Sequence, residues 1–154
     1  MKKTIILSLL AILIIPLLVM GCGKTNAASD SSNKEAKTIE ISIDEFTADN
    51  HITRNIELPH PGSLIVTLAS NPTTGYQWGE IPVMTTAGKD PVMSQQSHNF
   101  VAPEKNEVVG APGKDVWVFD SLRTGSTAIN FGYGRSWEGG EKDTWTLAIN
   151  VSVK

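Results

Sequence analysis

The chain has 154 residues, a formal net charge of −3 and one cysteine, Cys22. A single cysteine excludes an intramolecular disulfide, so a folded domain must be stabilised by its hydrophobic core. Residues 38–154 carry 8 Lys and Arg residues against 14 Asp and Glu residues, a formal charge of −6. This acidic balance argues against nucleic acid or anionic lipid as the domain's partner, because both attract positively charged surfaces.

Residues 1–21 have the features of a secretory leader. Two lysines precede an apolar run over residues 5–20, which is too short to span a bilayer comfortably. Residues 19–22, Val-Met-Gly-Cys, resemble the bacterial lipobox. That resemblance implies a lipoprotein signal peptide over residues 1–21 and a diacylglycerol on Cys22; an uncleaved N-terminal anchor with an idle thiol is the alternative. Both interpretations place the domain outside the cytoplasm, and the first predicts an exported, membrane-anchored lipoprotein on the extracytoplasmic side.

Residues 22–37 follow as the lipidated cysteine and a flexible tether. From residue 23 onward this stretch is polar and lacks aromatic and β-branched apolar side chains. Such a segment cannot offset its ordering entropy by burial. The remaining span, Thr38 to Lys154, has the usual size of one domain with a single core.

Apolar and polar residues alternate with a period of two through most of that domain. The alternation covers residues 39–43, 64–68, 129–133 and 145–153; a continuous apolar run covers 116–119, and residues 76–81 and 92–102 complete the set. Turn-forming clusters separate these runs, and no ten-residue helical period occurs. The sequence predicts an all-β fold, an immunoglobulin-like antiparallel β-sandwich of seven to eight strands, although the pattern separates a sandwich from a barrel only weakly.

The first candidate functional loop is Asn71, Pro72, Thr73, Thr74, Gly75 and Tyr76. A tight turn between strands explains Asn71, Pro72 and Gly75, because these residue types set or permit turn dihedrals. It does not explain two adjacent threonines. Thr73 and Thr74 at a loop apex would place two hydroxyls and two amides on a narrow projection that fits a cleft.

The second candidate loop consists of Gly110, Ala111, Pro112 and Gly113 and precedes the apolar run at 116–119. One interpretation is a simple hairpin connection. The other is a contact loop, because two glycines let main chain lie close against another protein and exchange backbone hydrogen bonds with it.

The third candidate loop contains Arg135, Ser136 and Trp137. Trp78, Trp117 and Trp145 fit the usual role of tryptophan in a core. Trp137 differs, because it lies beside an arginine in a glycine-rich, charged segment. Exposed Trp and Arg are the side chains found most often as interface hot spots.

These three motifs, in this order and at these separations, resemble the chagasin family of protease inhibitors over residues 38–154. The resemblance implies an immunoglobulin-like sandwich with the three loops at one end, acting as a reversible, noncovalent inhibitor of papain-like cysteine proteases. By motif, Thr73 and Thr74 would enter the active-site cleft while Asn71, Pro72, Gly75 and Tyr76 hold the loop's shape. Gly110 to Gly113 would lie on the substrate side of the cleft, and Arg135 and Trp137 on the opposite side.

Two residues depart from the family pattern. Ser136 stands where the family usually has proline, so the third loop should be less preorganised. Pro112 has no N–H, which removes one possible main-chain hydrogen bond to the protease.

Two other functions remain as alternatives. An immunoglobulin-like surface lipoprotein, such as an adhesin or glycan binder, would bind a ligand without inhibiting a protease. An enzyme is disfavoured, because His51, His60 and His98 are scattered and no catalytic or metal-binding motif occurs. We therefore expect no catalytic residue, no cofactor and no metal, and a monomer. The sequence does not identify the target protease.

Overall fold

The computed structural model describes residues 34–79, 83–86, 88, 90–103 and 110–154. The predicted signal peptide, Cys22 and most of the predicted tether lie outside the described residues. Within the described part of the chain, no helix has the length and apolar character needed to cross a bilayer. The elements are β1 (Glu35–Ile41), α1 (Ile43–Ala48), β2 (His51–Leu58), β3 (Gly62–Ser70), the 3₁₀ turn η1 (Pro72–Thr74), β4 (Gln77–Trp78), β5 (Val83–Thr86), β6 (Met93–Val101), β7 (Gly113–Ser121), β8 (Gly125–Gly134) and β9 (Trp145–Val153).

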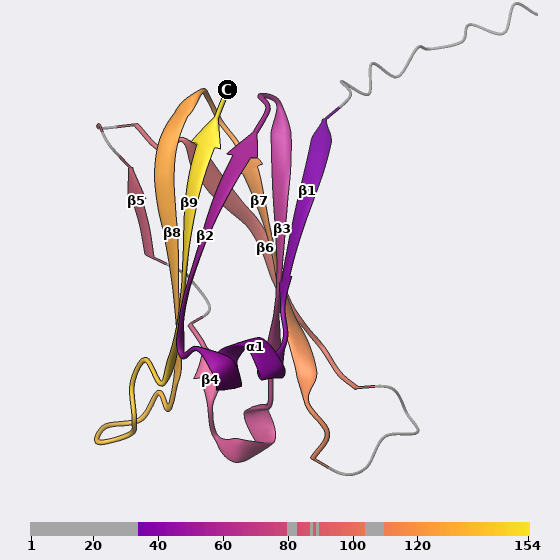
Figure 1. The fold of residues 1–154 in the computed structure, drawn as a ribbon, viewed down its shortest axis with the longest axis vertical. Coiled ribbons are helices and arrows are strands. Elements are labelled where there is room, and N and C mark those ends of the chain that lie inside the picture. Colours follow the sequence, from indigo (N-terminus) through magenta and orange to yellow (C-terminus); the bar gives the residue numbers. More distant parts are fainter. Residues whose placement is uncertain (1–33, 80–82, 87, 89, 104–109) are drawn as a thin grey trace, which may run out of the picture. The chain divides into compact units, whose positions relative to one another are not determined.

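The strands form two open sheets that face each other (Figure 1). One sheet has the order β1-β3-β7-β6; the other has the order β2-β9-β8-β4, and β5 also pairs with β8. The predicted sandwich is therefore present. Its sheets are mixed rather than purely antiparallel, because β1 pairs with β3 and β2 pairs with β9 in parallel. Helix α1 connects β1 to β2, and the chain crosses from the first sheet to the second through this helix.

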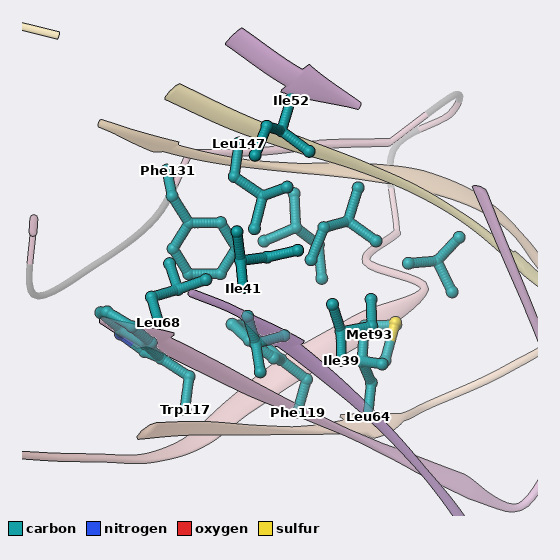
Figure 2. Packing of buried hydrophobic residues seen from close by; sticks show 14 of the residues in the cluster. Ile39, Ile41, Ile52, Leu64, Leu68, Met93, Trp117, Phe119, Phe131 and Leu147 are labelled. Atoms are coloured by element: carbon teal, nitrogen blue, oxygen red, sulfur yellow. The ribbon is translucent and has the colours of Figure 1, made fainter. Parts of the chain in front are cut away.

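The core fills the space between the sheets, as Figure 2 shows. In β3, β7, β8 and β9 every second side chain is buried, as the period-two pattern predicts. Trp117 and Phe119 are fully buried, and the Phe131 ring meets both of them edge-on from the opposite sheet. These contacts join the two sheets and make the sandwich a rigid support for its loops.

Several boundaries differ from the sequence-based expectation. Strand β1 begins at Glu35, four residues before Ile39, where the apolar alternation begins. Ile43 begins α1 instead of ending a strand. Strand β2 was not predicted, because Arg54 interrupts the apolar alternation between Ile52 and Ile56. The short β5 was also missed, and among the described residues 76–79 only Gln77 and Trp78 form a strand, β4.

Helix α1 is short but has a complete N-terminal cap. The Ser42 hydroxyl accepts a hydrogen bond from the Glu45 N–H, and the Glu45 carboxylate accepts one from the Ser42 N–H. This reciprocal capping box satisfies two amides of the first turn. Arg54 of β2 donates a further hydrogen bond to Glu45 at 2.8 Å. The cap thus starts α1, which lies at the same end of the sandwich as β4 (Figure 1), and Phe46 is its single buried residue.

Candidate functional site

The three predicted loops lie at the same end of the sandwich (Figure 1). Strand pairing accounts for this placement. Ser70, which precedes the first loop, pairs with Gly113, where the second loop ends. Gln77, which follows the first loop, pairs with Gly134, which precedes the third. Loops that lie far apart in the sequence are therefore brought together by the register of β3 with β7 and of β4 with β8.

The first loop is closed by hydrogen bonds within itself. The N–H and the hydroxyl of Thr74 both donate to the Asn71 carbonyl oxygen, at 3.2 and 2.7 Å. The Thr73 hydroxyl donates to Asn71 Oδ1 at 2.6 Å, and the Gly75 N–H donates to the Pro72 carbonyl at 3.0 Å. Gly75 has a φ of +80°, a left-handed conformation that favours glycine.

This geometry refines the expected role of the two threonines. Both side chains are exposed, as the sequence predicts for the loop apex. Their hydroxyl hydrogens, however, are used to hold the loop on Asn71. What the apex offers to a partner is therefore hydroxyl lone pairs and methyl groups on a fixed backbone.

Asn71 also joins the first loop to the second. Its side-chain amide Nδ2 donates to the Gly110 carbonyl at 2.9 Å. Gly110 has a φ of +89°, and a Cβ on Gly113 would lie 2.4 Å from the Val101 carbonyl oxygen. Both glycines of the second motif are thus required by the backbone, one by conformation and the other by close packing. Residues 104–109, which precede this motif, lie outside the described residues.

Trp137 joins the third loop to the first. A Cβ on Gly75 would lie 2.7 Å from an atom of the Trp137 ring, so the indole packs directly on this glycine. Half of the Trp137 surface remains exposed. The Arg135 guanidinium carbon lies 4.5 Å from the centroid of the Tyr76 ring and 5.4 Å from that of Trp137, within the range of cation–π attraction.

An aromatic cluster lies next to the first and third loops. It comprises Phe46, Tyr76, Trp78, Tyr133 and Trp145, whose neighbouring ring centroids are 4.9 to 5.7 Å apart. The Tyr133 hydroxyl accepts a hydrogen bond from the Asn71 N–H at 3.0 Å and so fixes the start of the first loop. Buried tyrosines usually find such a partner.

Sequence reasoning missed three residues of this arrangement. Phe46 was hidden because the six-residue helix is too short to show a period. Tyr133 was assigned to the core face of a strand, which is correct for its ring but gives no sign of its bond to Asn71. Glu141 follows the third motif, and its carboxylate accepts a hydrogen bond from the Tyr76 hydroxyl.

The three histidines lie outside these loops. His51 contacts Thr146, His60 contacts Ser121, and His98 contacts Asp115 at 2.6 Å while stacking on Trp117. Each has a separate structural partner. The described residues contain no group of three or more His, Cys, Asp or Glu side chains that could hold a metal ion.

Comparisons with known proteins identify the family of this chain. Residues 58–151, which include all three loops, match the family model described as Chagasin family peptidase inhibitor I42. Amoebiasin-2 of Entamoeba histolytica is 30% identical over 91 residues, which make up 58% of this chain and 68% of amoebiasin-2.

Two solved structures share the fold. The crystal structure of the cysteine protease inhibitor EhICP2 from Entamoeba histolytica has a TM-score of 0.56 and 23% identity, covering 77% of this chain and 97% of EhICP2. The structure of PbICP-C in complex with falcipain-2 has a TM-score of 0.54 and 16% identity, covering 78% of this chain and 99% of the matched one. The predicted sandwich is confirmed by both. With the family model spanning most of the folded domain, the chain belongs to the chagasin family of peptidase inhibitors.

Proposed function

We propose that this protein is a reversible, noncovalent inhibitor of papain-like cysteine proteases and that its three loops occupy the active-site cleft. Family membership supports inhibition rather than catalysis. EhICP2 is described as a cysteine protease inhibitor, and PbICP-C was solved in complex with falcipain-2. The observation that carries the proposal is the closed first loop, joined to the second loop by Asn71 and to the third by Trp137.

The closed first loop explains how occlusion avoids cleavage. A papain-like enzyme cuts a substrate when an extended peptide carbonyl is delivered to its thiolate. Between Asn71 and Gly75 the backbone is folded into a 3₁₀ turn, and the Asn71 and Pro72 carbonyls accept hydrogen bonds within the loop. Such a loop fills the space above the catalytic thiolate and imidazolium without presenting a peptide bond in the geometry of attack.

The flanking loops supply affinity in this proposal. Trp137 exposes half of its surface and is held against Gly75, while Arg135 is held against Tyr76. A large aromatic side chain that is already positioned loses little entropy when it binds. On the other flank, Ala111 and Pro112 extend the contact along the cleft, with the Gly110 carbonyl fixed by Asn71.

We further propose that the inhibitor is exported and attached to a membrane by a lipid on Cys22. The lipobox-like residues 19–22 and the polar segment that follows them support this part. A Cys22→Ser substitution should release the folded protein into the soluble fraction with its inhibition intact. Retention of the serine variant in the membrane would contradict a lipid on Cys22, and loss of inhibition by the soluble variant would contradict the separation of attachment from function.

The inhibitory function is tested by titrating papain with the purified protein and measuring residual hydrolysis of a peptide substrate, with trypsin as the class control. We expect stoichiometric loss of papain activity, recovery of activity on dilution, and an uncleaved inhibitor by mass spectrometry. Trp137→Ala should weaken inhibition more than about tenfold with little change in Tm, because hot-spot truncations cost about 2 kcal/mol or more. Unchanged papain activity at micromolar protein would refute inhibition of this enzyme.

A further inference from the structure

Lys142 has an unusual set of partners in the third loop. Its ammonium nitrogen Nζ donates to the Trp137 carbonyl oxygen at 3.0 Å and also to the Arg135 carbonyl oxygen. The Arg135 carbonyl belongs to the peptide bond that precedes Ser136, and the Trp137 carbonyl belongs to the residue that follows Ser136. One side chain therefore bonds to the backbone on both sides of the same residue.

The remaining hydrogen bonds of the loop close it around this contact. The Arg135 N–H donates to the Glu141 carbonyl at 2.6 Å, and the Gly140 N–H donates to the Trp137 carbonyl at 3.1 Å. The Trp137 carbonyl thus accepts two hydrogen bonds, and only the Lys142 contact reaches across to Arg135. Without it, none of the hydrogen bonds given for the described residues would hold the Arg135 carbonyl, which directly precedes Ser136.

Among the described residues, no carboxylate forms an ion pair with the Lys142 ammonium group. The ion pairs found among the described residues involve Lys34, Arg54, His98, Lys114 and Lys154, and none of them includes Lys142. An ammonium group has three donors and no acceptor, and its hydrogen bonds to carbonyls are stronger than those between neutral groups. Two of these donors bond to the carbonyl oxygens of the residues on either side of Ser136.

We propose that Lys142 is a positioning residue that preorganises Arg135 and Trp137 for protease binding by clamping the backbone around Ser136. This inference rests on the proposed inhibitory function, and it assigns to Lys142 the conformational restraint that a proline at position 136 would otherwise supply. Serine leaves φ at position 136 free, whereas proline fixes it near −65°. Among the hydrogen bonds of the described loop, none is donated by the Ser136 N–H, so a proline there would remove no bond.

The central experiment compares Lys142→Met with Lys154→Met in the papain assay. Methionine keeps an apolar stem of similar length and removes the ammonium group. Lys154 is a matched control, because it is an exposed lysine paired with Glu57 at the opposite end of the sandwich, and its loss changes the net charge equally. We expect Ki to rise about tenfold for Lys142→Met and to stay within about twofold for Lys154→Met.

The kinetics separate positioning from direct contact. If only a fraction of the molecules holds the competent loop, the observed association rate is reduced in proportion to that fraction, while dissociation changes little. We therefore expect the loss to appear in the association rate constant. A Lys142→Met loss confined to the dissociation rate would overturn the proposal, because it would show that the ammonium binds the protease itself.

A second substitution tests whether proline at position 136 can replace the Lys142 contacts. Ser136→Pro should restore most of the inhibition lost in Lys142→Met, because proline supplies the restraint on φ that the lost ammonium contacts supplied. Lys142→Arg, which keeps a charged donor group, should retain most of the activity. In ¹⁵N relaxation measurements without protease, Lys142→Met should lower the order parameters of residues 136–139, and Lys154→Met should not.

These arms distinguish the two proposals. If the wild-type protein does not inhibit papain, the proposed function fails, and the relaxation experiment still tests whether Lys142 orders the loop. If the wild-type protein inhibits and Lys142→Met inhibits equally well, the positioning role of Lys142 is refuted while the proposed function stands. Equal loss in Lys142→Met with and without Ser136→Pro would also refute it.

Discussion

The first and third loops lie side by side at one end of the sandwich, but they are held in different ways. The first loop is closed by its own residues, since Asn71 accepts hydrogen bonds from both threonines. The third loop has no such internal acceptor for Arg135 and is closed by Glu141 and Lys142, which follow the motif. The conformation of a loop that is closed by its own residues can be inferred from the sequence of that loop. The conformation of a loop that is closed by later residues cannot.

The two loops nevertheless share one support. Tyr133 bonds to the start of the first loop and immediately precedes the strand end that leads into the third. Its ring stacks on Tyr76 and Trp145, and Phe46 completes the cluster from α1. Substitutions should therefore fall into those that disturb both loops through this support and those that disturb one loop alone.

The largest effect should come from Phe46→Ala, which removes the support common to both loops. Phe46 is fully buried, and its ring centroid is 5.2 Å from those of Trp78 and Trp145. Truncation should lower the free energy of unfolding by about 3–5 kcal/mol in urea denaturation. Phe100→Ala is the control, because Phe100 is 45% exposed and should cost only about 1 kcal/mol. Equal losses for the two variants would show that the cluster is not a structural support.

Gly75→Ala tests the contact between the two loops. Alanine at position 75 would have to adopt a left-handed backbone conformation. Its Cβ would also lie 2.7 Å from the Trp137 ring. We expect more than about tenfold weaker inhibition and a shift of the Trp137 indole N–H resonance. Gly79→Ala is a matched control, since its Cβ would meet nothing within 4 Å. An unchanged Trp137 resonance in Gly75→Ala would indicate that the loops are independent.

Asn71→Asp separates the first loop from the second. Aspartate keeps the oxygen that accepts from Thr73 but loses the donor to the Gly110 carbonyl. The stability cost should be about 1 kcal/mol by thermal or urea unfolding, with weaker inhibition. Asn150→Asp is the control. It removes an exposed side-chain donor, Asn150 Nδ2, which bonds to Asn55 Oδ1 at 2.9 Å, and it should leave inhibition unchanged. If both variants inhibit like the wild type, the Asn71 bridge has no functional role.

The smallest effect concerns pH and the start of α1. The Ser42 N–H that donates to Glu45, together with the Arg54 guanidinium, holds the pKa of the Glu45 carboxyl below its ordinary value. Because the pKa of Glu45 is lower in the folded than in the unfolded protein, the ionised carboxylate raises the free energy of unfolding at pH values above the unfolded pKa of 4.5. This contribution is lost as the pH falls through the pKa of the folded protein. Glu45→Gln should thus be slightly less stable than the wild type at pH 7. The difference should shrink as the pH falls below 4.5 and the Glu45 carboxyl of the wild type becomes protonated, and a difference that stays the same size from pH 7 into acid would contradict this origin.

The sequence predicts much of this architecture because its strands obey a strict alternation. Leu64, Val66 and Leu68 point inward, as expected, and so do Ile129, Phe131 and Tyr133. The alternation fails where a long polar side chain occupies an inward position, as Arg54 does in β2. The parallel pairings of β1 and β2 were hidden for another reason, because they depend on a six-residue helix that carries the chain from one sheet to the other.

The candidate site shows the same division. The turn chemistry of Asn71, Pro72 and Gly75 and the exposure of Trp137 were predictable, because each depends on the residue type and its immediate neighbours. The positions of Tyr133 and Lys142 were not, since their hydrogen bonds join residues that are distant in sequence or lie beyond the motifs. Contacts between two loops can be predicted only when the register of the strands that carry the loops is known.

The most direct test of the central claim is hydrogen exchange of the inhibitor measured by mass spectrometry with and without papain. Simultaneous occupation of the cleft predicts slower exchange on complex formation at residues 71–76, 110–113 and 135–137. Exchange should be unchanged at the opposite end of the sandwich, around residues 58–62. Protection at that opposite end, or protection of only one of the three loops, would contradict the account.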